Sequence, residues 1–313
     1  MDKWTPRLAF ALLLLGFTEF VAWQQAATYS LVDWLAVLAI YAALSTALLD
    51  ALARWYTHPW SSVLLVGGVF GLAHSSLITL SVHHNLPVSV LFYATGLGTL
   101  MFLLAFQSFR FLYCGAFSLQ WLYGLTPIIG FLVGVWLHWV PEIRTAGVNV
   151  PSLGDSLPYI VAMLLLPALL IFYLPLPRRI EREDWLLQPL EWGAVGVVLG
   201  SVVVLRLPHF TLLSTTILGV ILAILLLMLW FAHRTLPSNP LFLPIAPTQQ
   251  RIIRWVVMFV PFSVVAWVAY QLPGDFQAIV LFGAVAAFGV LWPPIVSIVI
   301  SFQAFIEMGR EEF

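Results

Sequence analysis

Long runs of apolar residues follow one another along the whole chain and are separated by short polar connections. Each run is about 20 residues long, which is the length that an α-helix needs to cross the hydrocarbon core of a bilayer. Within each run the apolar residues are continuous and do not alternate with polar ones, which favours helices over the strands of a membrane barrel. Ten spans are predicted: Pro6–Ala26, Leu31–Ala53, Trp60–Val82, Pro87–Phe109, Gly115–Val140, Leu157–Leu174, Leu190–Leu207, Thr211–Ala232, Ile252–Gln271 and Ala278–Ala304.

The connections between these spans are short, and many begin or end in proline. Proline is tolerated in the first turn of a helix and stops a helix that would otherwise continue. No connection is long enough for a soluble domain, so we predict an all-α, polytopic membrane protein built as one transmembrane bundle over residues 1–313. The first run follows a positively charged residue, Lys3, as the apolar part of a signal peptide would. Its length and the lack of a clear cleavage pattern predict a retained first helix.

Basic residues decide the predicted threading, because Lys and Arg are enriched in the cytoplasmic connections of membrane proteins. If the ten spans alternate in direction, only Arg144 and Arg206 of the 13 Lys and Arg residues fall on the side opposite the N-terminus. The other basic residues all fall on the N-terminal side. We therefore expect both termini in the cytoplasm and the chain in the cell membrane, which is the inner membrane where a cell has two.

The composition supports a membrane protein and excludes several other classes. Hydrophobic residues make up 62% of the chain and charged residues 9%, whereas soluble domains carry about 25% charged residues. The net charge is −1 and the basic residues are scattered along the sequence, so neither nucleic acid nor strong attraction to an anionic lipid surface is indicated. The lipid bilayer is the expected partner, other membrane subunits are possible partners, and the sequence identifies no cofactor.

Cys114 is the only cysteine. It cannot form an internal disulfide, and a single cysteine excludes cysteine-based metal and iron–sulfur sites.

Two features of the sequence concern the packing of the helices. Pro293 and Pro294 interrupt the last span, and the carbonyl groups that they leave without a helical partner need a donor from a neighbouring helix. Small residues four positions apart mark spans that another helix can approach closely, within the protein or from another subunit. These small residues are Gly67, Gly71 and Ser75 on the third span, Gly130 and Gly134 on the fifth, and Gly196 and Gly200 on the seventh.

Ionisable residues inside the spans are few, and each is a candidate for function because burying it in lipid is costly. Glu19 and His74 lie at a similar depth in the outer half of spans one and three, and His138 and Arg206 lie near the outer ends of spans five and seven. We predict that these four residues form the binding site. We also expect Glu19 and His74 to be coupled and to share a proton, because each would oppose the other's cost of burial.

A metal or proton site formed by Glu19, His74, His83, His84 and His138 is a further interpretation of the same residues. Imidazole and carboxylate groups suit zinc or iron, but no metal-binding spacing such as H-E-x-x-H is present. The adjacent residues His83 and His84 cannot point the same way on a helix. The simpler interpretation is that these side chains bond a neighbouring helix or lipid headgroups, and we predict neither a metal site nor a catalytic residue.

Asp50 with Arg54, followed by Phe70-Gly-Leu-Ala-His74, resembles the EExxxR and FxxxH motifs of the CPBP (Abi) family of intramembrane proteases. In that family, glutamates and histidines on adjacent helices activate water for peptide hydrolysis. Leu49 stands where the family has its first glutamate, Asp50 replaces the second, and no HxxxN motif follows. The resemblance covers about 25 of the 313 residues, and we do not extend the protease activity to this chain.

Two classes of function fit the sequence. A secondary transporter or permease for a small or amphipathic molecule agrees with the size, the number of spans and the polar residues near the outer side, by analogy with folds of that kind. A non-catalytic integral subunit or assembly factor of a larger membrane complex agrees with the scarcity of buried polar groups. We rank transport first and a degenerate protease-like protein third, and an enzymatic activity is not favoured.

Overall fold

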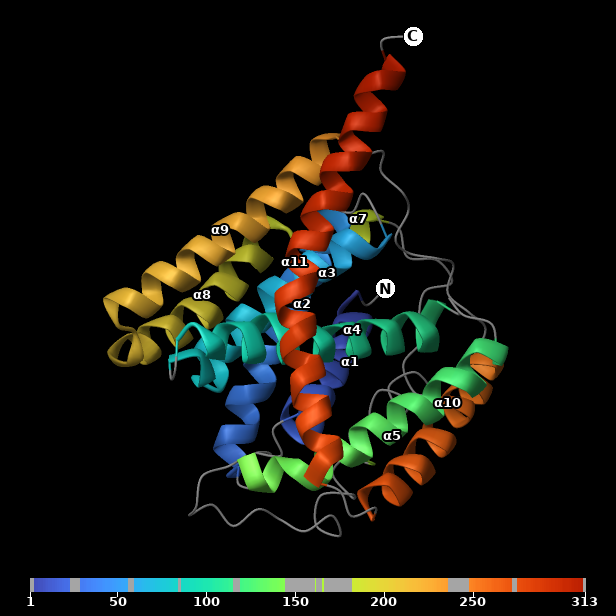
Figure 1. Cartoon of the computed structure of the whole chain (residues 1–313). Coiled ribbons are helices and arrows are strands. Elements are labelled where there is room, and N and C mark those ends of the chain that lie inside the picture. The colour runs from blue at the N-terminus through green and yellow to red at the C-terminus, as the bar shows by residue number, and fades with distance from the viewer. Residues whose placement is uncertain are drawn as a thin grey trace. The chain divides into compact units, whose positions relative to one another are not determined.

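The computed structural model describes residues 3–22, 29–55, 59–83, 86–114, 119–143, 161, 165, 182–235, 248–271 and 275–311. Every regular element in these ranges is a helix (Figure 1), which confirms the all-α prediction for this part of the chain. The elements are α1 (Trp4–Leu15), η1 (Gly16–Ala22), α2 (Leu31–Trp55), α3 (Pro59–Ala73), η3 (His74–Ile78), η4 (Ser81–His83), η5 (Val90–Gly98), α4 (Thr99–Phe109), η6 (Arg110–Cys114), α5 (Leu119–Ile143), α7 (Arg182–Trp185), α8 (Pro189–Arg206), η7 (Leu207–His209), α9 (Leu212–Thr235), α10 (Thr248–Tyr270) and α11 (Asp275–Glu311).

Eight helices of the described ranges are long and apolar enough to cross a membrane, as expected for a multi-pass membrane protein. A further apolar stretch, Gly124–Leu137 within α5, is shorter and falls in the predicted fifth span. The predicted sixth span, Leu157–Leu174, lies outside the described residues except for 161 and 165. The number of ten spans and the cytoplasmic termini stay predictions. The eight helices are Trp4–Ala22, Leu31–Trp55, Trp60–Ile78, Val90–Tyr113, Arg182–His209, Leu212–Arg234, Gln250–Tyr270 and Val280–Ile306.

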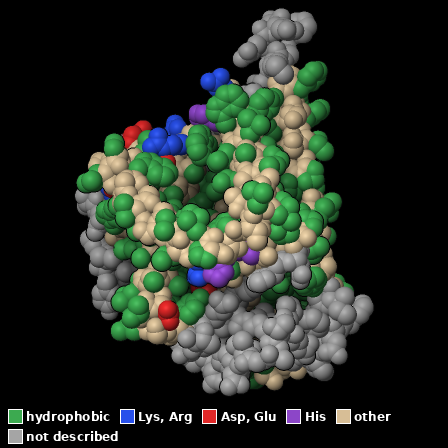
Figure 2. Space-filling model, turned by 90° about the vertical axis from the view of Figure 1, so that its left-hand side faces the viewer, with side chains coloured by type: hydrophobic (Ala, Val, Ile, Leu, Met, Phe, Trp, Pro, Cys, Tyr) green, Lys and Arg blue, Asp and Glu red, His purple; other side chains and the backbone are tan. Residues whose placement is uncertain are grey.

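Apolar side chains also cover much of the described surface. Figure 2 shows one face of the molecule, where hydrophobic side chains predominate and charged and histidine side chains gather in small groups. Leu212 and Phe305, for example, are 87% and 71% exposed. Soluble proteins rarely expose apolar patches of more than a few hundred Å², so this surface is suited to contact with lipid or with another membrane helix.

Contacts along the chain define two compact units, and each unit is assembled from three separate segments. Unit 1 comprises Met1–Ala42, Leu104–Ile180 and Leu243–Ala284. Unit 2 comprises Ala43–Leu103, Glu181–Phe242 and Val285–Phe313. The boundaries fall inside α2, α4 and α11, so each of these helices contributes to both units. We describe each unit by itself, and the single bundle over residues 1–313 stays a prediction.

In unit 1, α5 and α10 pack closely along a line of small residues. A methyl group added at Gly130 would lie 2.5 Å from the backbone oxygen of Phe262, and one added at Gly134 would collide with the backbone oxygen of Ala266. The predicted close approach at Gly130 and Gly134 is therefore confirmed. Because both positions advance by four residues together, α5 and α10 run in the same direction, as the predicted threading requires of spans five and nine.

In unit 2, the small residues of α3 allow η5 to come into direct contact with its backbone. A methyl group at Gly71 would collide with the backbone oxygen of Ala94, and one at Gly98 would lie 2.6 Å from the Cα of Gly71. The predicted small-residue contact on the third span is thus confirmed at Gly71. On α8, by contrast, a methyl group at Gly196 or Gly200 would meet no atom of the described protein within 4 Å.

Three of the described π-helical stretches, η1, η3 and η5, contain a Ser or Thr hydroxyl that donates to a backbone carbonyl four residues earlier. A π-helical turn replaces the i→i−4 hydrogen bond by i→i−5, and it leaves a carbonyl group that needs another donor. In η1 the Thr18 hydroxyl donates to the Leu14 carbonyl at 2.6 Å, and in η3 the Ser76 hydroxyl donates to the Leu72 carbonyl at 2.6 Å. In η5, Thr95 donates to the carbonyl of residue 91 at 3.0 Å. Side-chain hydroxyls therefore satisfy part of the irregular backbone.

The proline pair of α11 shows the same type of compensation. The helix continues through Pro293 and Pro294, and because Pro293 has no N–H group, the carbonyl of Gly289 has no helical donor. The Thr95 hydroxyl donates to this carbonyl at 3.0 Å, and the Trp292 indole Nε1 donates to the Thr95 carbonyl at 2.8 Å. This confirms that a neighbouring helix satisfies a carbonyl freed by the proline pair.

Gly71→Leu is expected to destabilise unit 2, because the new side chain would collide with the backbone of η5 and could not move into open space. Overpacking of this kind costs about 1 to 3 kcal/mol or more. Gly219→Leu on α9 is the matched control, because a methyl group there would meet no atom of the described residues within 4 Å. Thermal unfolding and size-exclusion chromatography in a mild detergent measure the effect, and equal tolerance at the two positions would contradict the packing described here.

Candidate functional site

A fully buried carboxylate lies at the centre of the polar site in unit 1. Glu19, in η1, is 0% exposed and accepts two hydrogen bonds from tyrosine hydroxyl groups. Tyr29 donates to Oε2 at 2.7 Å, and Tyr41 donates to Oε1 at 2.7 Å. Each carboxylate oxygen therefore has its own donor, which offsets part of the cost of removing the charge from water.

Neighbouring elements hold these hydroxyl groups in place. Tyr41 is buried in α2, and its hydroxyl group is also hydrogen-bonded to the hydroxyl of Thr18. Tyr29 precedes α2 and packs edge-to-face on Trp34, with 5.7 Å between the ring centroids. Trp34 in turn stacks on Phe20 of η1 at 5.3 Å. Phe20 and Trp34 thus support the ring of Tyr29, whose hydroxyl group donates to Glu19.

The arrangement is suited to binding and releasing a proton. A tyrosine hydroxyl can donate to an ionised carboxylate and can accept from a protonated one, so the same contacts serve both forms of Glu19. The hydroxyl groups of Tyr41 and Thr18 extend the hydrogen-bonded chain beyond the carboxylate. The buried Thr18 hydroxyl has one proton, which it can donate either to Tyr41 or to the Leu14 carbonyl, and the chain ends there.

His74 lies in unit 2, at the first position of η3. It is 1% exposed, and its ring stacks on Phe70, one turn earlier, with 5.7 Å between the centroids. The neighbouring side chains of Ser75 and Ser76 are buried as well. Because Glu19 belongs to unit 1 and His74 to unit 2, their predicted coupling stays a prediction, whereas the hydroxyl partners of Glu19 are present within unit 1.

Arg206, a third predicted binding residue, lies at the end of α8 in unit 2. Its Nε donates to the carbonyl of Leu77 in η3 at 3.1 Å, so it binds the C-terminal end of the segment that begins with His74. Nearby in the same unit, the His83 ring packs edge-to-face on Phe210 with 4.6 Å between the centroids. The side chain of the fourth predicted residue, His138, and all of His84 lie outside the described part of the structure.

The residues of the protease-like motif have structural partners in unit 2. Asp50 is buried and accepts from Arg54 Nε at 2.7 Å and from the backbone N–H of Leu187 at 2.6 Å. Arg182 Nε donates to the carbonyl of Ala53 at 2.6 Å. These bonds join the end of α2 to the segment that contains α7 and leads into α8. Within the described residues, no group of three or more His, Cys, Asp or Glu residues is placed to hold a metal ion.

The tyrosine partners of Glu19 were not among the residues predicted from the sequence. Tyr41 lies 22 positions after Glu19, inside another predicted span, and Tyr29 lies in the connection between the two spans. Sequence spacing cannot show which residues of two different helices face each other. The available signal was a tyrosine hydroxyl in an apolar run, because such a group needs a hydrogen-bond partner when it is buried.

No family model, curated protein or solved structure matches this chain. The resemblance to the CPBP family therefore rests on the two short motifs alone.

Tyr41→Phe is expected to destabilise the protein by about 1 to 2 kcal/mol. This exceeds the ~0.6 kcal/mol average of interhelical hydrogen bonds in membranes, because the acceptor here is a carboxylate. In a Glu19→Gln background the same change should cost clearly less, since the charged acceptor has been removed. Reversible unfolding in mixed detergent micelles gives the four stabilities of this double-mutant cycle. Additive effects of the two substitutions would show that the bond contributes nothing specific.

Proposed function

We propose that this chain is a secondary transporter or permease for a small or amphipathic molecule, in which Glu19 binds and releases the coupling proton. The observation that carries this proposal is a fully buried carboxylate in a π-helical segment of a membrane helix, hydrogen-bonded by two tyrosine hydroxyl groups. Ionisable residues within membrane spans are costly and mark ion pathways and proton relays. Short π-helical stretches also occur frequently at functional sites.

The distribution of irregular backbone supports the same conclusion. Glu19 lies in η1, His74 begins η3 and Arg110 begins η6, so three ionisable residues of the apolar helices coincide with π-helical segments. A segment that can change between i→i−4 and i→i−5 bonding provides a local rearrangement that protonation of Glu19 can bias. Coupling in a secondary transporter needs such a pair of alternative local states.

A second function, an integral subunit of a larger complex, is favoured by the surface of α8. Gly193, Gly196 and Gly200 have no atom of the described protein within 4 Å of an added methyl group. Membrane helices use small residues of this spacing for close association, so the line on α8 is suited to a helix of another protein. Purification in a mild detergent distinguishes the two functions, because a subunit would retain a stoichiometric partner and a transporter would elute alone.

Proton-coupled transport can be measured in proteoliposomes that contain a pH-sensitive dye. A panel of small organic anions and amphipathic cations is added outside, and the proton flux that each compound elicits is recorded. Wild-type protein is expected to give a flux with at least one compound, and Glu19→Gln should lower that flux at least about tenfold, because the substituted amide cannot exchange the proton.

Glu183→Gln in α7 is the matched control, because it removes an exposed carboxylate of unit 2, whereas Glu19 is buried in unit 1. Its flux should equal that of the wild type. A Glu19→Gln protein that is folded and transports protons normally would contradict the proposal. Absence of any flux from the pure wild-type protein, together with a retained stoichiometric partner, would establish the subunit function in its place.

A further inference from the structure

Unit 1 brings together arginines that are far apart in the sequence. Arg110 begins η6, and Arg251 and Arg254 lie in the first two turns of α10. The guanidinium carbon of Arg254 lies 5.5 Å from the centroid of Phe111, the residue after Arg110. Arg251 is 7% exposed and lies close enough to Tyr113 of η6 to interact with it electrostatically. α10 therefore places Arg251 and Arg254 beside η6, the element that begins with Arg110.

Several buried donor atoms of this cluster have no hydrogen-bond partner among the described residues. They are Nε of Arg110, Nη1 of Arg254 and Nε2 of Gln107. Arg110 Nη1 donates to Gln107 Oε1 at 3.4 Å, and its guanidinium group lies 6.0 Å from the centroid of Phe106. Arg110 and Arg254 thus contact aromatic rings and an amide, and within the described residues neither forms an ion pair. Buried donors without partners are costly, so these atoms point to a ligand that accepts hydrogen bonds.

The charges around the cluster indicate that this ligand is an anion. The described acidic side chains of unit 1 are Glu19, which binds Tyr29 and Tyr41, and Asp33, which binds Ser30. The first turn of α10 has no acidic residue, although an arginine there is unfavourable because the helix N-terminus already carries a partial positive charge. An anion at this position would offset both the guanidinium charges and the helix dipole.

We propose that Arg110 and Arg254, together with Gln107 and Arg251, form a binding site for a phosphate group, either of an anionic phospholipid or of a soluble phosphate compound. Guanidinium groups match phosphate oxygens with paired donors, and the Gln107 amide adds a neutral donor. The predicted threading places all three arginines at the cytoplasmic surface, where anionic headgroups are abundant. This site is independent of the proton-binding role of Glu19.

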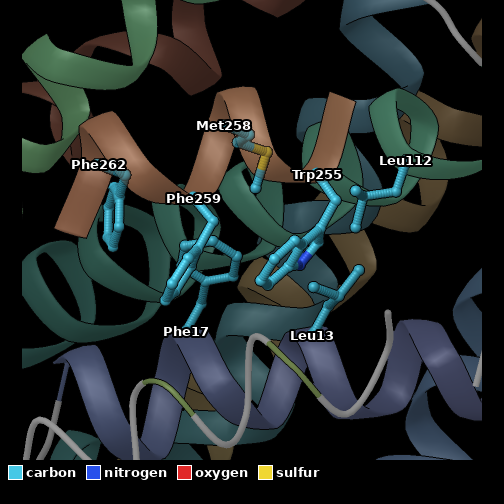
Figure 3. A pocket seen from close by; sticks show the side chains of 7 residues that line it. All are labelled: Leu13, Phe17, Leu112, Trp255, Met258, Phe259 and Phe262. Carbon is cyan, nitrogen blue, oxygen red and sulfur yellow. The ribbon is translucent and has the colours of Figure 1, made fainter. Parts of the chain in front are cut away.

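A small apolar cavity next to the cluster limits what else the site can hold. It has a volume of about 20 Å³ and lies between α1, η1, η6 and α10, with Leu13, Leu112, Trp255 and Phe259 among its lining residues (Figure 3). A volume of this size holds about one water molecule, so the cavity is too small to enclose an acyl chain. Recognition at this site therefore depends on the phosphate, and an attached lipid tail would remain in the bilayer.

The test compares the full-length wild type with the double variant Arg110→Gln/Arg254→Gln. Binding of phosphatidylglycerol is measured by native mass spectrometry of detergent-purified protein, with phosphatidylcholine as the reference lipid without net charge. The variant should bind phosphatidylglycerol about 30-fold more weakly, since each arginine near a membrane surface contributes about fivefold. Arg234→Gln is the matched control, because Arg234 is an exposed arginine of unit 2 that contacts Trp230.

A second arm titrates inorganic phosphate and follows the melting temperature of the same proteins. Stabilisation by phosphate without preference for phosphatidylglycerol assigns the site to a soluble phosphate compound, and the reverse result assigns it to the lipid. If the double variant does not fold, it is replaced by the single variants and by Arg110→Lys. The lysine keeps the charge and loses the paired donors. The proposal is overturned if the variants and Arg234→Gln bind both probes as tightly as the wild type.

Discussion

The hydrocarbon core of a membrane offers no hydrogen bonds, so every polar group of a spanning helix must be satisfied by the protein. The described helices meet this constraint repeatedly with hydroxyl side chains. Thr95 donates to the carbonyl that Pro293 leaves without a partner. Thr18 and Ser76, in π-helical segments, donate to carbonyls one turn earlier, in α1 and α3. Tyr29 and Tyr41 likewise donate hydrogen bonds to the carboxylate of Glu19. The polar site is therefore one of several places in the described helices where a hydroxyl side chain donates to a buried acceptor.

Unit 1 contains both proposed sites and a small apolar cavity. Phe17, two residues before Glu19, lines the small cavity, and so does Trp255, which follows Arg254. Glu19 and the arginines do not line this cavity. The proton site and the phosphate site therefore use different side chains of unit 1, and each can be altered by its own substitutions.

Much of the helical architecture could be predicted from the sequence, because span length and apolar continuity are set by the bilayer itself. The contacts at Gly71 and Gly134 were predictable for a similar reason, since small residues four positions apart present one face of a helix. The same pattern at Gly196 and Gly200 has no internal partner in the described structure. Spacing identifies a face that another helix can approach, but it does not identify the helix that approaches it.

The site was predictable in part only. Glu19 was identified because an acidic residue in an apolar run is costly, but its tyrosine partners depend on how two helices face each other. The arginine cluster could not be predicted either, because about 140 residues separate Arg110 from Arg254 and the sequence does not show that their helices meet. Neither the π-helical segments nor the division into two units has a sequence signal as simple as hydrophobic periodicity.

The central claim is that Glu19 exchanges a proton within its pair of tyrosine donors. Infrared difference spectroscopy of the protein in lipid, recorded while the pH is changed, measures this directly through the carbonyl band of a protonated carboxyl group. The account predicts a band that appears and disappears with pH, is absent from Glu19→Gln, and changes frequency in Tyr41→Phe because one hydrogen bond is lost. A spectrum in which Glu19→Gln removes no pH-dependent band would contradict the claim and leave the carboxylate a purely structural group.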